Sequence, residues 1–176
     1  RRGIAIGIAV AALLPAAWNY VPRTINEYPW NIRAQHLQQA QMRRFAHEHL
    51  QQPIAVNDLG LAVWANPDYV LDLYGLANNE ARRLRIFAPT PGWAGPLVAR
   101  HGVSVIMIYD SFIEAGISPD WEPLGKLVML RAAGYVGNAE VNFYAATSED
   151  VVSARAALDD WVPGLPPDAC FVFSGA

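Results

Sequence analysis

The first 22 residues constrain this chain most strongly, because they contain a long run without charge. Arg1 and Arg2 are followed by residues 3–22, in which no side chain is charged. A helix of about 20 residues spans roughly 30 Å, the thickness of a bilayer's hydrocarbon core. Trp18 and Tyr20 stand at the far end of the run, where aromatic side chains anchor helices at the lipid–water interface. The sequence therefore predicts one transmembrane helix over residues 1–22.

Two other interpretations of this segment stay open. A secretory signal peptide fits the basic start and the apolar run, although Pro15 and Trp18 make a poor cleavage region. A buried core helix is the third interpretation. The arginines on the two sides of the run nearly balance, so the positive-inside rule does not settle which way the helix is oriented.

The composition excludes several classes of function. The chain has 176 residues and a net charge of -3, which argues against a nucleic-acid partner that would need a concentrated basic surface. Cys170 is the single cysteine, so an internal disulfide and a multi-cysteine zinc site are excluded. Phosphate-binding, dinucleotide-binding and serine-hydrolase motifs are absent from the sequence. We therefore expect no catalytic residue, no metal and no cofactor in this chain.

Hydropathy patterns after residue 22 predict a single α/β domain. Two prolines in residues 21–30 indicate a connector, and residues 31–52 form an amphipathic helix, so residues 23–52 lead into a soluble α/β domain over 53–176. We expect a mixed sheet of about five strands with flanking helices. The strands are expected at 54–56, 69–76, 103–112, 124–130 and 139–147, and the helices at 77–87 and 148–162. Asn78 or Asn79 is the candidate N-cap of the first helix, and Ser148 that of the second.

Polar residues at the ends of these strands are the candidate ligand-binding residues. Asp58 and Asp110 each follow an apolar strand, and ligands of open α/β sheets bind beyond the carboxyl ends of strands. Asn57 stands beside Asp58, and Asp72 lies inside the strand predicted at 69–76. Such side chains can contact a sugar hydroxyl or a divalent ion. The alternative is structural: Asp58 closes a turn, and Asp72 accepts hydrogen bonds from the backbone or from an arginine.

Three further groups of side chains allow a functional and a structural interpretation. The spacing of His47 and His49 does not place them on one helix face, so they do not form a zinc site of the protease type. One group is Arg82, Arg83 and Arg85, with Arg43 and Arg44, which can meet lipid phosphates or cover a solvated helix face. Aromatic side chains can stack on a sugar or fill the core. These aromatic residues are Trp93, Tyr109, Trp121, Tyr144 and Trp161.

Residues 54–78 resemble a recurring segment in bacterial membrane glycosyltransferases of the GT-C type. In that segment a short strand ends in Asn/Asp-Asp-x-Gly, which corresponds to residues 57–60, and a second strand carries Asp-Leu-x-Gly-Leu, which corresponds to residues 72–76. Residues 101–112 and 141–147 look like later strands of the same domain. The resemblance covers roughly residues 1–147.

The resemblance implies an accessory role. In such enzymes the polyprenyl-phosphate sugar donor and the catalytic acid belong to the membrane-embedded part, which this chain does not contain. The chain would then be the C-terminal domain on the extracytoplasmic side of the inner (cytoplasmic) membrane. Its partners would be membrane lipid, a glycan acceptor and, through the membrane part, the sugar donor. The alternative is a single-anchor extracytoplasmic binding module that has no link to glycosyl transfer.

Overall fold

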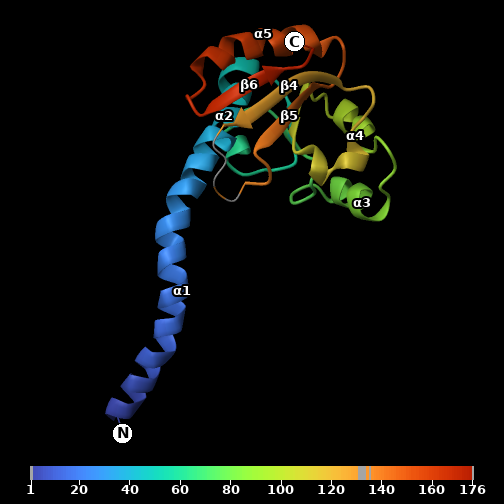
Figure 1. Ribbon diagram of the computed structural model, residues 1–176. Coiled ribbons are helices and arrows are strands. Elements are labelled where there is room, and N and C mark those ends of the chain that lie inside the picture. The colour runs from blue at the N-terminus through green and yellow to red at the C-terminus, as the bar shows by residue number, and fades with distance from the viewer. Residues whose placement is uncertain (1, 131–133, 135, 176) are drawn as a thin grey trace.

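A computed structural model describes residues 2–130, 134 and 136–175, with the side chains of residues 4–6, 8 and 16 left out. It shows an α/β domain from which one long helix, α1 (Arg2–Leu37), extends away (Figure 1).

The domain is built on a mixed sheet of six strands in the order β2-β1-β3-β5-β4-β6. β1 pairs in parallel with β2 and β3, and the remaining neighbours pair antiparallel. The strands are β1 (Ile54–Val56), β2 (Val70–Asp72), β3 (Val105–Ile108), β4 (Glu122–Met129), β5 (Glu140–Ala145) and β6 (Ala169–Phe173). The predicted α/β class with a mixed sheet and flanking helices is confirmed, with one strand more than expected.

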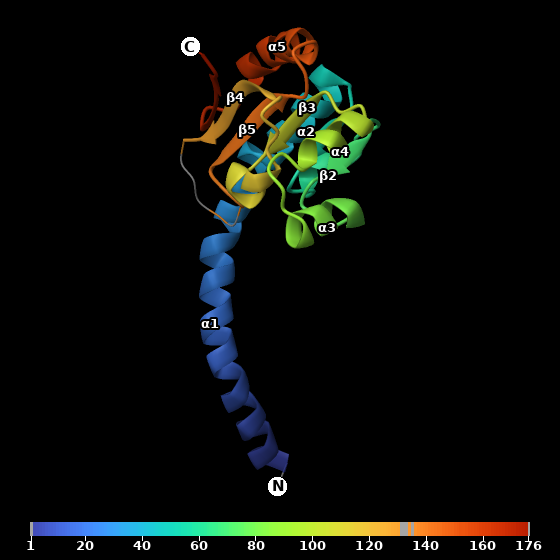
Figure 2. The same ribbon diagram turned by 90° about the vertical axis from the view of Figure 1, so that its right-hand side faces the viewer.

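Helices cover both faces of the sheet (Figure 2). On one face lie the end of α1, α2 (Gln39–Arg44), the π-helical segment η1 (Phe45–Leu50) and α5 (Asp150–Trp161), around a core that includes Phe45, Phe143 and Trp161. On the other face lie α3 (Asn79–Phe87) and α4 (Ala94–Arg100). Short 3-10 turns complete the chain: η2 (Leu61–Val63), η3 (Asp110–Phe112), η4 (Glu114–Gly116) and η5 (Val162–Gly164).

The strand patterns explain this layering. All four residues of β3 are buried, as a strand covered on both faces requires. β5 alternates between buried and partly exposed residues, as predicted for residues 139–147. The strand predicted at 69–76 is shorter than expected, because a turn begins directly after Asp72. The sequence analysis does not predict β6. Its five residues directly follow a proline-rich stretch, which indicates a loop.

The prediction of a connector at residues 21–30 is wrong, because α1 continues through it. Pro15, Pro22 and Pro29 all lie inside the helix. Each proline removes a single N–H donor, and their spacing of seven residues places all three on nearly the same face. Prolines on one face bend a helix toward the same side, and α1 continues through all three of them. It ends only at Leu37, where Gln38 departs from helical backbone angles.

Most of the described side chains of α1 before residue 31 are exposed, and the helix meets the domain only through its last turns. Within the described residues, no helix combines the length and the apolar character needed to cross a membrane. The predicted transmembrane helix over residues 1–22 gains no support from that finding.

Candidate functional site

The sheet does not bring Asp58 and Asp110 together. β1 and β3 are parallel neighbours, so Asp58 and Asp110 both lie just beyond the carboxyl ends of these strands, at the same end of the sheet. Successive side chains of a strand point to opposite faces. Asp58 accordingly contacts Tyr109, whose ring belongs to the core beneath α5, whereas Asp110 contacts Tyr144, which packs against the core beneath α3 and α4. The predicted pair of carboxylates is therefore divided between the two faces.

Asn57 holds the ends of β1 and β3 together. Its side chain is buried, its Nδ2 donates to the carbonyl oxygen of Tyr109 at 3.0 Å, and its Oδ1 accepts from the Tyr109 N–H at 3.1 Å. A primary amide can satisfy one donor and one acceptor of a neighbouring backbone in this way. Both functional groups of Asn57 are thus engaged in extending the sheet.

Asp72 organises the loop that leads from β2 into α3. Asp72 is 3% exposed, and its carboxylate accepts hydrogen bonds from four backbone N–H groups. Oδ1 accepts from Tyr74 at 2.8 Å and Gly75 at 2.9 Å, and Oδ2 accepts from Ala77 at 2.6 Å and Asn78 at 3.3 Å. A carboxylate offers about four lone-pair sites, so these bonds use its accepting capacity. The structural alternative for Asp72 fits this geometry.

A glycine makes this loop possible. Gly75 has a φ of 90°, and a Cβ there would lie 2.5 Å from Cβ of Arg82. After the loop, Asn78 begins α3 as predicted, because its Oδ1 accepts from the N–H groups of Glu80 and Ala81. In the Asp-Leu-x-Gly-Leu segment, the Asp72 carboxylate therefore holds the turn through backbone hydrogen bonds, and Gly75 supplies the positive φ that the turn needs.

Asp58 belongs to a polar cluster where α1 and α2 meet the sheet. Its Oδ2 accepts from Nε2 of Gln39 at 2.7 Å and lies 3.3 Å from the hydroxyl of Tyr109. That hydroxyl donates to Oε1 of Gln38 at 2.6 Å, and the Gln38 amide donates to the carbonyl of Asn138. We call Gln38, Gln39, Asp58 and Tyr109 the hinge cluster, since Gln38 occupies the break between the two helices.

The hinge cluster keeps its tyrosine protonated. Burial of the ring, followed by the nearby charge of Asp58, raises the pKa of Tyr109 well above its ordinary value. Tyr109 is 1% exposed. Its O–H is therefore a fixed hydrogen-bond donor, and no histidine or lysine belongs to this cluster to exchange a proton with it.

Asp110 makes a similar contact on the other face. Its Oδ2 accepts from the hydroxyl of Tyr144 at 2.7 Å, and burial together with this bond raises the pKa of Tyr144 above its usual value. Its Oδ1 is buried and has no hydrogen-bond partner among the described residues. Of the four predicted site residues, Asp110 alone retains an unused buried acceptor.

A groove lies elsewhere, at the opposite end of the central strands. It has a volume of about 780 Å³ and runs between α4 and the loops at 118–121 and 146–150. Its walls are mainly apolar, with Pro96 and Val103 on one side, and its rim carries the carboxylates of Asp120, Glu149 and Asp150. The Asp150 carboxylate accepts from Thr147, and the Asp120 carboxylate accepts from the Ser118 hydroxyl at 3.5 Å; Asp120 and Glu149 are exposed. No lysine or arginine lines the groove within the described chain, so it disfavours anions and suits a neutral, hydroxyl-rich molecule.

Sequence reasoning missed this groove because its residues come from α4 and from two loops that lie far apart in the sequence. The one sequence feature that pointed toward the groove was Trp121, a candidate for sugar stacking, which lines the groove but is almost wholly buried. The other aromatic candidates for sugar stacking fill the core instead: Trp93, Tyr109 and Trp161 are buried, and Tyr144 is half-buried. In the part of the chain that the structure describes, no three His, Cys, Asp or Glu side chains gather as a metal site.

A family model described as Domain of unknown function (DUF8728) matches residues 30–144. This chain belongs to that family. The matched region begins where α1 enters the domain and ends within β5, so it contains the hinge cluster, the Asp72 loop and most of the groove. No curated protein and no solved structure matches the chain.

Proposed function

We propose that this chain is the C-terminal accessory domain of a GT-C-like membrane glycosyltransferase that uses a polyprenyl-phosphate-linked sugar. α1 tethers the domain to the inner membrane, and the α/β domain lies on the extracytoplasmic side without catalytic residues of its own. The observation that carries the proposal is the uncovered apolar surface of α1.

That surface needs a covering. Leu14 is 63% exposed and Trp18 is 82% exposed, and the neighbouring Val10 and Leu13 are exposed as well. Large exposed apolar surfaces in proteins mark sites of contact with membranes or other proteins. Lipid is the favoured covering here, because residues 3–22 carry no charge and prolines are tolerated in membrane helices.

The accessory role is supported by how the strand-end residues are used. Asn57 and Asp72 spend their hydrogen-bonding groups on the backbone, and Asp58 is bonded to Gln39. The motifs that resemble the GT-C segment are thus suited to holding the fold. The groove beside α4 offers the place for a neutral glycan acceptor, since its open carboxylates can accept hydrogen bonds from sugar hydroxyls.

Alkaline carbonate extraction of membranes that contain the full chain tests the tether. We expect the chain to stay in the membrane pellet, and Leu13→Glu together with Leu14→Glu to release it, because charge is costly in hydrocarbon. The matched control is Val152→Glu on α5, because Val152 is also an exposed apolar residue but lies in the domain. Complete release of the unaltered chain by carbonate would contradict the proposal.

A second experiment addresses glycosyl transfer. The full chain alone should transfer no sugar from a polyprenyl-phosphate donor, and sugar transfer by the chain alone would contradict its accessory role. When the native protein that contains this chain is purified from its membranes in mild detergent, the preparation should show polyprenyl-phosphate-dependent transferase activity. A membrane-bound chain that purifies without such activity favours the alternative, a single-anchor binding module whose ligand occupies the groove.

A further inference from the structure

α3 presents an outer face of unusual composition. Ala81 and Leu84 pack against the core, and with 3.6 residues per turn the opposite face carries Arg82, Arg83 and Ile86, with Phe87 at its border. Phe87 is 78% exposed, and Leu76 in the preceding loop is also exposed. The outer face of α3 therefore combines basic and large apolar side chains, the composition of helices that lie at a membrane surface.

The charges on this face are available. Arg82 and Arg83 are exposed and form no ion pair with any part of the chain that the structure describes. The single acidic residue of α3, Glu80, is bound to Arg100 at 2.7 Å. Arg85 lies over the ring of Tyr74 and donates to its carbonyl oxygen, which fixes it at the edge of the face. The face thus presents positive charge without a neutralising carboxylate of its own.

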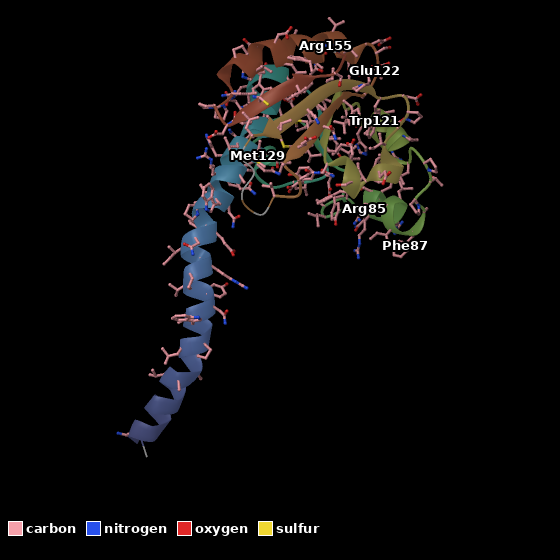
Figure 3. The ribbon with its side chains drawn as sticks, viewed as in Figure 1. Arg85, Phe87, Trp121, Glu122, Met129 and Arg155 are labelled. Atoms are coloured by element: carbon pink, nitrogen blue, oxygen red, sulfur yellow. The ribbon has the colours of Figure 1, made fainter. Side chains whose placement is uncertain are left out.

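The position of α3 matches that of the tether. In two views at right angles, α3 lies at the end of the domain from which α1 emerges, whereas α5 lies at the opposite end (Figures 1 and 2). Arg85 and Phe87 stand at this same end, and Arg155 stands at the far one (Figure 3). Membrane helices tilt by about 20° on average, so a tilt of α1 toward α3 brings this face to the lipid surface.

We propose that the outer face of α3, together with Leu76, docks on an anionic phospholipid surface and fixes the orientation of the domain above the membrane. Phe87, Ile86 and Leu76 enter the interface, and the guanidinium groups of Arg82 and Arg83 pair with lipid phosphates. This inference rests on the proposed tethering by α1. In this orientation α5 lies at the end of the domain away from the lipid.

Site-specific fluorescence in vesicles tests the docking. Cys170→Ser removes the native thiol, and a polarity-sensitive dye is then placed on the full chain at Phe87→Cys, Val152→Cys or Leu14→Cys. Position 152 is the matched control, because Val152 is 76% exposed on α5. Each labelled protein is reconstituted in phosphatidylcholine vesicles with or without phosphatidylglycerol, and the dye is challenged with an aqueous quencher.

We expect the dye at position 87 to be shielded in anionic vesicles and the dye at position 152 to stay accessible. Replacing Arg82 or Arg83 by glutamine should weaken docking about fivefold for each arginine, whereas Arg155→Gln should leave it unchanged. Added salt should also weaken docking by screening the charges.

The outcomes separate the two proposals. If position 14 is shielded but position 87 stays fully accessible, the docking of α3 is wrong and the tether stands. Equal shielding of position 87 in neutral and anionic vesicles overturns the assignment of an anionic surface. If position 14 is itself accessible to the quencher, the tethering by α1 fails.

Discussion

Replacing Asp72 should destabilise the domain strongly, because its carboxylate satisfies four backbone N–H groups at once. A buried donor left without a partner costs about 1–3 kcal/mol. Ala77 is exposed, so water can replace part of the lost bonding on the outer side of the loop. We therefore expect Asp72→Ala to lower the free energy of unfolding by about 3 kcal/mol. Asp72→Asn keeps one acceptor oxygen but turns an amide N–H₂ toward two N–H donors. We therefore expect it to lower the free energy of unfolding by about 2 kcal/mol.

Urea unfolding of the full chain in detergent micelles, followed by near-ultraviolet circular dichroism, measures this loss. Asp159→Ala is the matched control, because Asp159 is an exposed acid on α5 and its removal should change stability by less than about 0.5 kcal/mol. If Asp72→Ala unfolds at the same urea concentration as the control, the structural interpretation of this carboxylate is wrong, and the interpretation of Asp72 as a ligand-binding residue is favoured instead.

Three further perturbations probe the same edge of the sheet. Asn57→Ala leaves the buried N–H and C=O of Tyr109 without partners, so the free energy of unfolding should fall by about 2–3 kcal/mol, measured by the same urea titration. Gly75→Ala should cost at least about 1 kcal/mol, since it combines a positive φ with a clash against Arg82; an unchanged midpoint would refute this. The raised pKa of Tyr109 favours the folded state below the ordinary tyrosine pKa of about 10, so stability should decline as the pH rises above that value. Tyr109 contributes about 1.4 kcal/mol per pH unit to this decline, in addition to the contribution of Tyr144, whose pKa is also raised. Tyr109→Phe should reduce this slope, and an unaltered slope would show that another group causes it.

Local patterns in the sequence were sufficient for much of the fold. The continuous apolar run of β3 and the alternation of β5 each reported on burial, and Asn78 marked the start of α3. The helix predicted at 148–162 was found, but Thr147 rather than Ser148 contacts its first turn through a bond from the Asp150 N–H. These elements are specified by residues within a few positions of one another.

Features that depend on distant residues were not predictable in this way. The division of Asp58 and Asp110 between two faces follows from strand register, which a list of strand ends does not contain. The hinge cluster joins Gln38 to Tyr109 across 71 positions, and the groove is assembled from α4 and two distant loops. The uninterrupted course of α1 was not predictable either, because proline usually indicates that a helix kinks or ends, whereas α1 continues through three prolines.

The central claim is that lipid covers α1, and hydrogen–deuterium exchange of its backbone amides tests this most directly. The full chain is compared in lipid nanodiscs and in detergent-free buffer. An uncovered helix opens readily in water, so its amides should exchange quickly there. The account predicts that the amides of residues 3–22 become strongly protected in nanodiscs, while those of α5 exchange equally in both. Equal exchange of residues 3–22 with and without lipid would contradict it.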